Sequence, residues 1–290
     1  MVSGNFLNIW FEIIFSQLQN IIPAISNLSK IAWGGSKFVY KAQVSGRWEA
    51  IKVCHLNLLQ GDSIRLRAFR EIDSLTKLTS PYIVKLGQIE PHVKKINDVE
   101  FLIYSEEYLP GKSLQDLMQE QYVPSEIELK NLLSCLLNAI EETASSHLVH
   151  RDIKPGNVIK NVPPRTFVLI DFSIALATDP NLSHLTATGM MSPKTNAYAA
   201  PELFAADYHQ IVTYRTDLYC AAYTVFSYAL GQPYFKNINE LLGAKRCPLL
   251  CTLRTDISEK FSCFLAQLLK KDSNLRSGNI TKLKEELKSL

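Results

Sequence analysis

The segment HRDIKPGN at positions 150–157 gathers three side chains suited to phosphate chemistry. The carboxylate of Asp152 can accept the proton of an attacking hydroxyl and orient it. The ammonium of Lys154 can neutralise charge that develops on a transferred phosphoryl group. The amide oxygen of Asn157 is a hard ligand of the kind that Mg²⁺ prefers. A chance polar turn would rarely combine these groups in this order, so the segment predicts in-line phosphoryl transfer onto a hydroxyl.

A second hard ligand follows the apolar run FVLI at positions 167–170, where Asp171 opens the sequence Asp-Phe-Ser. Taken alone, an aspartate after a strand is best explained as part of a turn. Its place after the segment at 150–157 favours a different interpretation. Asp171 is predicted to hold Mg²⁺ against the β- and γ-phosphates of ATP.

The elements that must position these residues are a strand-rich first part and a helical second part. Strand patterns with a tight glycine turn occupy residues 30–54, and further strand-like runs lie at 83–89 and 101–108. Residues 62–79 have helical periodicity, and helical patterns dominate from residue 114 onward. The predicted fold class is α+β, with one main helix beside the strands of the first part.

An amphipathic helix is predicted at residues 5–22, ahead of these elements. Its apolar face holds Phe6, Trp10, Ile14, Leu18 and Ile21, and its polar face holds Asn5, Asn8, Glu12, Ser16 and Gln19. The absence of Lys or Arg before Lys30 argues against a secretory signal, and the regular polar residues argue against a membrane span. We expect the apolar face to pack against the domain or a second copy, with a partner protein or a membrane surface as the alternative.

Composition limits the class of protein. Of the 290 residues, 47% are hydrophobic and 20% are charged, which is ordinary for a soluble globular protein. A formal net charge of +3, with scattered basic residues, disfavours binding to nucleic acid. The six cysteines form no CxxC pair. They are interpreted as buried thiols in a reducing compartment, which favours a cytoplasmic location.

From about Ile31 to its C-terminus, the chain resembles a eukaryotic-type (Hanks-type) serine/threonine protein kinase, including the bacterial members of that family. The motifs that carry the resemblance, in the family's order, are EAIK at 49–52, FRE at 69–71, HRDIKPGN at 150–157, DFS at 171–173 and APE at 200–202. The resemblance implies a bilobal protein-kinase-like fold with an N-lobe at about 30–107 and a C-lobe at about 112–290. Residues 1–29 would form an N-terminal helical extension. ATP and Mg²⁺, or Mn²⁺ in its place, are the implied cofactors, and proteins are the implied substrates.

The resemblance also assigns individual site residues. Lys52 matches the strand lysine that holds the α- and β-phosphates, and Glu71 matches the helix glutamate that pairs with it. The positions that would contact the nucleotide are Gly34, Gly35, Lys37, Val39, Ala50, Glu107, Leu109 and Ile159. Asp217 matches an aspartate that binds the backbone of the catalytic loop. Arg276 matches an arginine that pairs with Glu202.

Substrate class and regulation follow from a few further positions. Lys154 favours serine or threonine acceptors over tyrosine, and Thr195 resembles the threonine that braces this lysine and the catalytic aspartate. Arg151 matches the usual partner of a phosphorylated activation segment, and autophosphorylation would supply that phosphate. Candidate phosphate acceptors are Thr186, Thr188 and Ser192. In the alternative interpretation the segment stays unphosphorylated and Arg151 is merely solvated.

The chain departs from the family pattern at three places. The three glycines of the phosphate loop fall at Ala32, Gly34 and Lys37, so one of the three remains, and the charge of Lys37 is expected to compensate in part. Ser173 replaces the glycine after Asp-Phe. Glu106 falls at the gatekeeper position behind the adenine, where a carboxylate needs a partner such as Lys52 or has a raised pKa.

These departures leave two alternatives to a protein kinase. One is a pseudokinase, an ATP-binding or scaffolding module with the same fold. The other is a small-molecule phosphotransferase, which would not normally carry the Ala-Pro-Glu segment with the Asp217 and Arg276 anchors. The presence of all five core residues, Lys52, Glu71, Asp152, Asn157 and Asp171, favours the catalytic interpretation.

Overall fold

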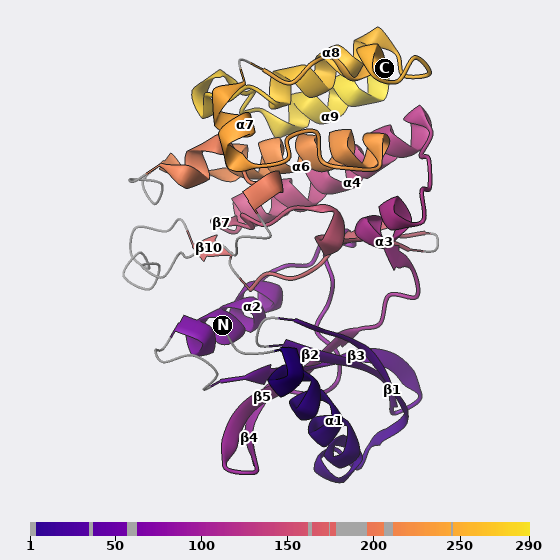
Figure 1. Cartoon of the computed structure of the whole chain (residues 1–290), viewed down its shortest axis with the longest axis vertical. Coiled ribbons are helices and arrows are strands. Elements are labelled where there is room, and N and C mark those ends of the chain that lie inside the picture. The colour runs from indigo at the N-terminus through magenta and orange to yellow at the C-terminus, as the bar shows by residue number, and fades with distance from the viewer. Residues whose placement is uncertain are drawn as a thin grey trace. The chain divides into compact units, whose positions relative to one another are not determined.

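The structure, a computed structural model, describes residues 4–34, 37–56, 63–161, 164–173, 175–177, 196–205, 211–244 and 246–290. The chain forms two compact units, each shown in Figure 1. Unit 1 comprises Met1–Thr76 and Val84–Leu109, and unit 2 comprises Lys77–Ile83 and Pro110–Leu290. The predicted α+β class, with a strand-rich first part and a helical second part, is confirmed.

Unit 1 is built on a five-stranded antiparallel sheet in the order β1-β2-β3-β5-β4. Its elements are α1 (Gly4–Ile21), β1 (Ile25–Gly34), β2 (Lys37–Val44), β3 (Arg47–His55), α2 (Ser63–Thr76), β4 (His92–Ile96) and β5 (Val99–Glu107). β1 begins at Ile25, before the position 30 expected from the sequence. The division into an extension at 1–29 and a domain at 30–290 stays a prediction.

The strand predicted at residues 83–89 is wrong, and the fourth strand lies at 92–96 instead. The segment makes two isolated bridges, and the backbone N–H groups of Gly87 and Ile89 both donate to Ser105 rather than to successive residues of a ladder. The true strand enters a two-residue hairpin at Asn97 and Asp98, whose φ angles are 47° and 61°. Two positive φ values characterise the hairpin turn that matches strand twist.

The two faces of the sheet carry different side chains. Phe38, Tyr40, Ala42 and Val44 alternate along β2 and are buried in one cluster with the apolar side chains of α1. Side chains between them in sequence, such as that of Val39, point to the opposite face, where Lys52 lies across from Val39 on β3. This opposite face therefore carries the residues predicted to meet the nucleotide.

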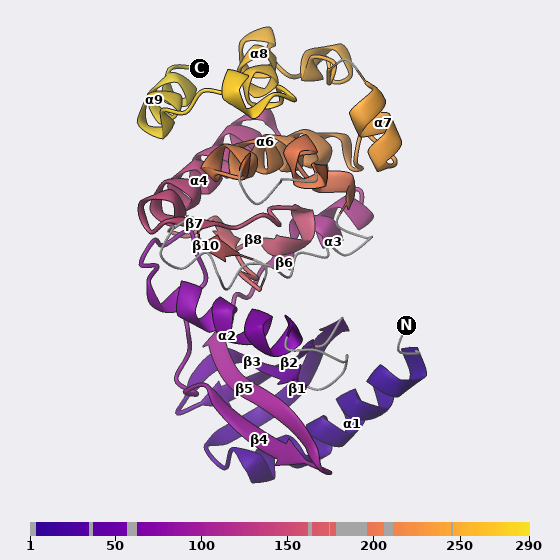
Figure 2. The same cartoon turned by 90° about the vertical axis from the view of Figure 1, so that its left-hand side faces the viewer.

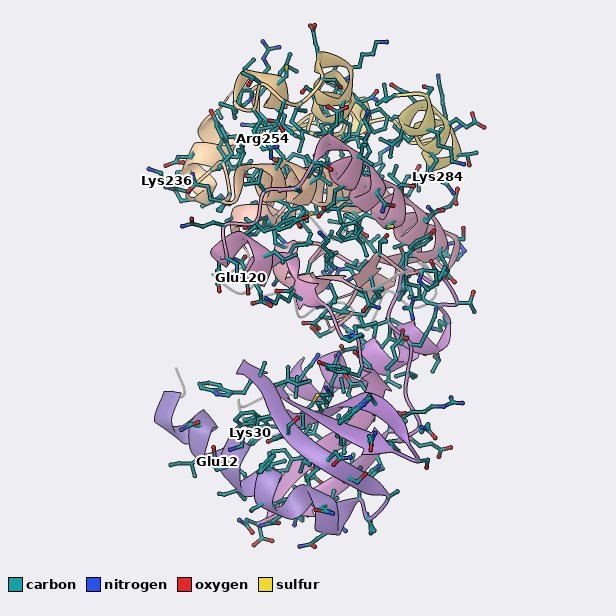
Figure 3. The ribbon with its side chains drawn as sticks, turned by 90° about the vertical axis from the view of Figure 1, so that its right-hand side faces the viewer. Glu12, Lys30, Glu120, Lys236, Arg254 and Lys284 are labelled. Carbon is teal, nitrogen blue, oxygen red and sulfur yellow. The ribbon has the colours of Figure 1, made fainter. Side chains whose placement is uncertain are left out.

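α1 covers the apolar face of the sheet, as Figures 1 and 2 show. The ring of Phe11 stacks on Tyr40 with centroids 4.9 Å apart, and the Tyr40 hydroxyl donates to the Phe11 carbonyl at 2.8 Å. On the outer side, Lys30 of β1 pairs with Glu12, and Figure 3 shows the two side chains together. The apolar face of α1 thus packs against its own unit.

Contact of α1 with a second copy or a membrane surface stays a prediction. Ile14 and Leu18 are fully buried against the sheet, so neither side chain is open to such a partner while the helix lies here. In the described part of the chain, no helix combines the length and the apolar character needed to cross a membrane.

Unit 2 is mainly helical. Its helices are α3 (Leu114–Gln119), α4 (Glu126–Ser145), α6 (Tyr214–Leu230), α7 (Ile238–Gly243), α8 (Glu259–Leu268) and α9 (Ile280–Ser289). Single 3₁₀ turns are η1 (Pro155–Asn157), η3 (Asn196–Tyr198), η4 (Pro201–Phe204), η5 (Leu250–Thr252) and η6 (Ser273–Leu275). Its short strands are β6 (Lys112–Ser113), β7 (Leu148–Val149), β8 (Val158–Lys160), β9 (Phe167–Leu169) and β10 (Leu176–Ala177).

The centre of unit 2 is α6, which is buried on all sides from Thr216 to Ala229. Gly231 ends this helix in the left-handed conformation at φ 72°, which glycine adopts without strain. A helix buried all round must satisfy any charged side chain within the protein. Asp217, in its first turn, is such a side chain.

The cysteines are free thiols. Cys54, Cys135, Cys220 and Cys247 are buried, as the sequence predicted. Cys263 is exposed on α8, because it lies on the outward side of an amphipathic helix, so the prediction of burial is wrong there.

Candidate active site

In unit 1, four charged side chains meet on the face of the sheet opposite α1. Lys52 of β3 donates to Glu71 of α2 at 2.8 Å and also pairs with Glu106 of β5. Lys37 of β2 donates to the second oxygen of Glu71 at 2.6 Å. The exposed fractions of Lys52, Glu71 and Glu106 are 6%, 0% and 3%, so little water screens these charges.

Strand register and a helix turn bring this cluster together. Lys52 lies opposite Tyr104 on β5, and Glu106 is the next residue of β5 on the same face, so it is a diagonal neighbour of Lys52. The sequence left open whether Glu106 pairs with Lys52 or has a raised pKa, and the structure shows both. Burial raises the pKa of Glu106 to about 7, and the positive charge of Lys52 acts against this rise. Glu71 adds to this rise in pKa, and Lys37 opposes it.

The predicted adenine contacts of unit 1 lie on the same face. Val39 pairs with Lys52 and Ala50 pairs with Glu106, and both small side chains are half-buried. At the end of β5, the Glu107 N–H donates to the Lys85 carbonyl at 2.9 Å. Leu109, half-buried, is the last residue of unit 1.

The glycine turn ahead of β2 is described in part. Gly34 pairs with Lys37 across the end of the β1–β2 hairpin, and Gly35 lies outside the described residues. The side chain of Lys37 therefore extends from the tip of this turn to Glu71 of α2.

In unit 2, the catalytic-loop prediction centres on the carboxylate of Asp152. Lys154 donates to its Oδ2 at 2.8 Å, and the Asn157 side-chain amide donates to the same oxygen at 2.9 Å. The other oxygen, Oδ1, is buried and has no hydrogen-bond partner among the described residues. Burial raises the pKa of Asp152 to about 6. A buried acceptor that has no hydrogen bond and lies beside a lysine is able to accept a hydroxyl proton.

Asp171 and Asn157 are brought together by the pairing of two short strands. β8 and β9 pair antiparallel, and the Ile170 N–H donates to the Asn157 carbonyl at 2.9 Å. Asp171 has a φ of 66°, a left-handed conformation that is costly for a non-glycine residue and tends to persist at functional sites. The negative charge of Asp171 contributes to the raised pKa of Asp152. Carboxylate and amide oxygens in this arrangement fit a hard divalent cation.

Asp217 holds the start of the catalytic loop. Its two carboxylate oxygens accept the backbone N–H groups of His150 at 2.7 Å and of Arg151 at 2.8 Å. Burial raises the pKa of Asp217 to about 7, although both hydrogen bonds oppose the shift. Arg151 has a φ of 66° and is 7% exposed, and its role as a partner of a phosphorylated segment stays a prediction.

Glu202 and Arg276 form the buried ion pair that the resemblance implied. Both guanidinium NH₂ groups donate to the carboxylate, at 2.6 and 2.9 Å. Arg276 also donates to the carbonyls of Lys270, Arg215 and Lys271. Every donor group of this fully buried side chain is therefore used.

The structure adds one residue to the site that the sequence left without a role. His150 accepts the backbone N–H of Asp152 at Nδ1 at 3.2 Å, and its Nε2 lies 3.2 Å from the Ile170 carbonyl. Its ring packs edge-on against Phe172 at 4.5 Å. The histidine thus joins the loop of Asp152 to the strand that leads to Asp171. Its place before Arg-Asp in the motif is the signal that would have found it.

Five predicted positions carry no structural description. Gly35, Thr186, Thr188, Ser192 and Thr195 lie outside the described residues. Ile159 belongs to β8 in unit 2 and is half-buried. The N–H of Ser173, which stands where the family has glycine, lies 3.4 Å from a carboxylate oxygen of Asp171.

Known proteins with similar sequences carry kinase names. A probable serine/threonine-protein kinase pknA2 of Bifidobacterium longum is 29% identical over 271 residues, 90% of this chain and 34% of that protein. The serine/threonine-protein kinase PknF of Mycobacterium tuberculosis is 30% identical over 215 residues, 71% of this chain and 42% of that protein. The chain thus spans less than half the length of these relatives.

Solved structures give the same fold. The crystal structure of the Mycobacterium tuberculosis PknI kinase domain matches with a TM-score of 0.66 at 20% identity, and covers 91% of this chain and 96% of that chain. The family model described as protein kinase domain matches residues 25–287, which include every described site residue above. The chain therefore belongs to the protein kinase domain family.

Proposed function

We propose that this chain is a serine/threonine protein kinase that transfers the γ-phosphate of ATP to protein hydroxyls. The observation that carries the proposal is the asymmetry of Asp152. One of its oxygens is fixed by Lys154 and Asn157, and the other is buried with no hydrogen-bond partner among the described residues. A carboxylate held in this way is ready to accept a hydroxyl proton. The relatives PknF and pknA2 are named serine/threonine-protein kinases, which supports the same class of substrate.

The other site residues have distinct tasks in this proposal. Lys52 positions the α- and β-phosphates, and Glu71 holds Lys52 in place. Lys154, bonded to Asp152, offsets charge on the γ-phosphoryl group as it moves. Val39, Ala50 and Ile159 contact the adenine. The Glu107 carbonyl and the Leu109 N–H bind the polar edge of the adenine.

Asn157 and Asp171 would hold Mg²⁺, or Mn²⁺ in its place. Two hydrogen bonds to Asp152 fix the Asn157 NH₂ group, and this sets the direction of its amide oxygen. When bound, the cation neutralises charge on the β- and γ-phosphates. The chain's own part is to keep both oxygen ligands on the paired ends of β8 and β9.

Regulation by autophosphorylation is part of the proposal. The buried Arg151 follows His150 in the loop that Asp217 fixes, so a phosphate bound by Arg151 would act on the position of Asp152. Thr186, Thr188 and Ser192 are the proposed phosphate acceptors, and Thr195 is proposed to brace Lys154 and Asp152. Substitution of Arg151 by alanine tests this step, because unchanged activity and unchanged dependence on phosphate would contradict it.

The test is phosphate transfer from γ-labelled ATP in the presence of Mg²⁺, with a basic protein acceptor and with a panel of small alcohols. We expect label on serine or threonine of the protein acceptor, none on the alcohols, and none with Asp152→Asn or Asp171→Ala. ATP binding is measured in parallel for each variant. Binding without transfer by the unaltered chain would contradict the proposal and favour a pseudokinase, and label on the alcohols would favour a small-molecule phosphotransferase.

A further inference from the structure

The charged cluster of unit 1 contains more than one lysine and one glutamate. Lys37, Glu71, Lys52 and Glu106 form a continuous chain of ion pairs that joins β2, α2, β3 and β5. Lys37 and Lys52 bind different oxygens of the same Glu71 carboxylate, at 2.6 and 2.8 Å. Their two ammonium groups are therefore close together, within one compact unit.

Glu106 changes the charge that Lys52 offers to a nucleotide. With Glu106 ionised and without Lys37, the group Glu71, Lys52 and Glu106 would carry a net charge of −1, two carboxylates against one ammonium. A triphosphate would approach that net negative charge in a poorly screened, buried setting. With Lys37 included, the two positive and two negative charges cancel.

Exposure shows which lysine is closer to solvent. The side chain of Lys37 is 18% exposed and that of Lys52 is 7% exposed. Lys37 also starts at the tip of the β1–β2 hairpin. An incoming anion could therefore reach the Lys37 ammonium with little movement of the protein. Reaching Lys52 would require more movement, because Lys52 is buried and pairs with two carboxylates.

We infer that Lys37 is a second phosphate-positioning lysine, and that its charge compensates for Glu106 at the site of Lys52. This inference rests on the proposed function, since it concerns how the same site binds a nucleotide. It assigns Lys37 and Glu106 as a coupled pair: the loss of one changes what the other contributes to phosphate binding.

The test is calorimetric binding of two probes, ADP and adenosine, which differ by the phosphates. We expect Lys37→Met to weaken ADP binding about tenfold, equal to about 1.4 kcal/mol. Its adenosine binding should be unchanged. Lys37→Arg should keep near-normal ADP affinity because it keeps the charge. Lys95→Met, on the exposed β4, removes one charge far from the cluster and serves as the control.

The coupling is tested with Glu106→Leu. Alone, this change should strengthen ADP binding several-fold, because it frees Lys52 from one carboxylate. In the Glu106→Leu background, Lys37→Met should weaken ADP binding by about twofold or less, rather than by the tenfold that it costs alone. Turnover measurements should show that Lys37→Met raises the KM for ATP by a larger factor than it lowers kcat.

Each other outcome has a definite meaning. Unchanged ADP binding by Lys37→Met, an equal loss of ADP and adenosine binding, or strictly additive effects in the double variant would overturn the inference. If Lys37→Met does not fold, weakened or unchanged ADP binding by Glu106→Leu would overturn it. Absence of ADP binding by the unaltered chain would overturn the proposed function itself.

Discussion

The carboxylate of Asp217 accepts the backbone N–H of Arg151 at 2.8 Å, and its second oxygen accepts the neighbouring N–H of His150. A helix buried on all sides thus supplies the anchor of the loop that carries Asp152. Each carboxylate oxygen accepts one backbone N–H. Replacing either oxygen with a hydrogen-bond donor would therefore leave one buried N–H without an acceptor.

Asp217→Asn tests this anchor. The new NH₂ group would face a backbone N–H, and one donor would lose its acceptor. We expect the free energy of unfolding in urea to fall by about 1–3 kcal/mol. Turnover should fall by a larger factor than ATP affinity, since Asp152 loses its support. Asp98→Asn, in the exposed β4–β5 turn, is the matched control and should behave as the unaltered chain.

The Glu202–Arg276 pair is predicted to be a major contributor to stability. Arg276→Met leaves a buried carboxylate and three carbonyls without their donor. The expected loss is about 3–5 kcal/mol of unfolding free energy. Lys284→Met breaks the partly exposed pair with Glu141 and should cost no more than about 1 kcal/mol. Similar losses for the two variants in chemical denaturation would contradict the structure.

Glu106 should make stability depend on pH. Its pKa is about 7 in the folded chain and 4.5 in the unfolded reference, so the folded state binds the extra proton between these values. The stability contributed by Glu106 is therefore complete below about pH 4.5 and is lost as pH rises towards 7. The unfolding free energy of the unaltered chain, minus that of Glu106→Gln, should fall by about 3 kcal/mol across this window. A difference that is flat or rises with pH would contradict the assignment.

The packing of α1 can be tested through its buried side chains. Ile14 is fully buried against the sheet, and Ile14→Ala should lower the unfolding free energy by about 2–5 kcal/mol. Gln19→Ala, on the exposed face of the same helix, is the control and should have little effect. Equal, negligible effects in thermal denaturation would show that the helix does not lie on the sheet in solution.

Much of the site follows from sequence because its residues sit in short local motifs. The segment at 150–157 folds back on itself, so the contacts of Asp152 with Lys154 and Asn157 need no distant partner. The pairing of Lys52 with Glu71 is long-range, and it was expected from the family resemblance. Helical periodicity found α1 and α2 with nearly correct bounds.

The parts that the sequence did not predict depend on long-range register. The Lys37–Glu71 pair joins a hairpin tip to a helix, and no local pattern specifies that contact. The apolar segment at 83–89 has strand-like composition, yet its backbone groups bond mainly to Ser105. β4 is exposed over most of its length and was missed, although Asn97-Asp98 marks its hairpin.

The placement of α1 also affects the order in which unit 1 folds while it is being synthesised. Trp10 packs against Phe101 of β5 with ring centroids 5.2 Å apart, so α1 contacts the last strand of its own unit. Contacts between such distant positions form slowly, because the intervening chain must first be ordered. A nascent chain that ends before Phe101 therefore lacks this partner of Trp10, and the apolar cluster of unit 1 is completed only when β5 has been synthesised.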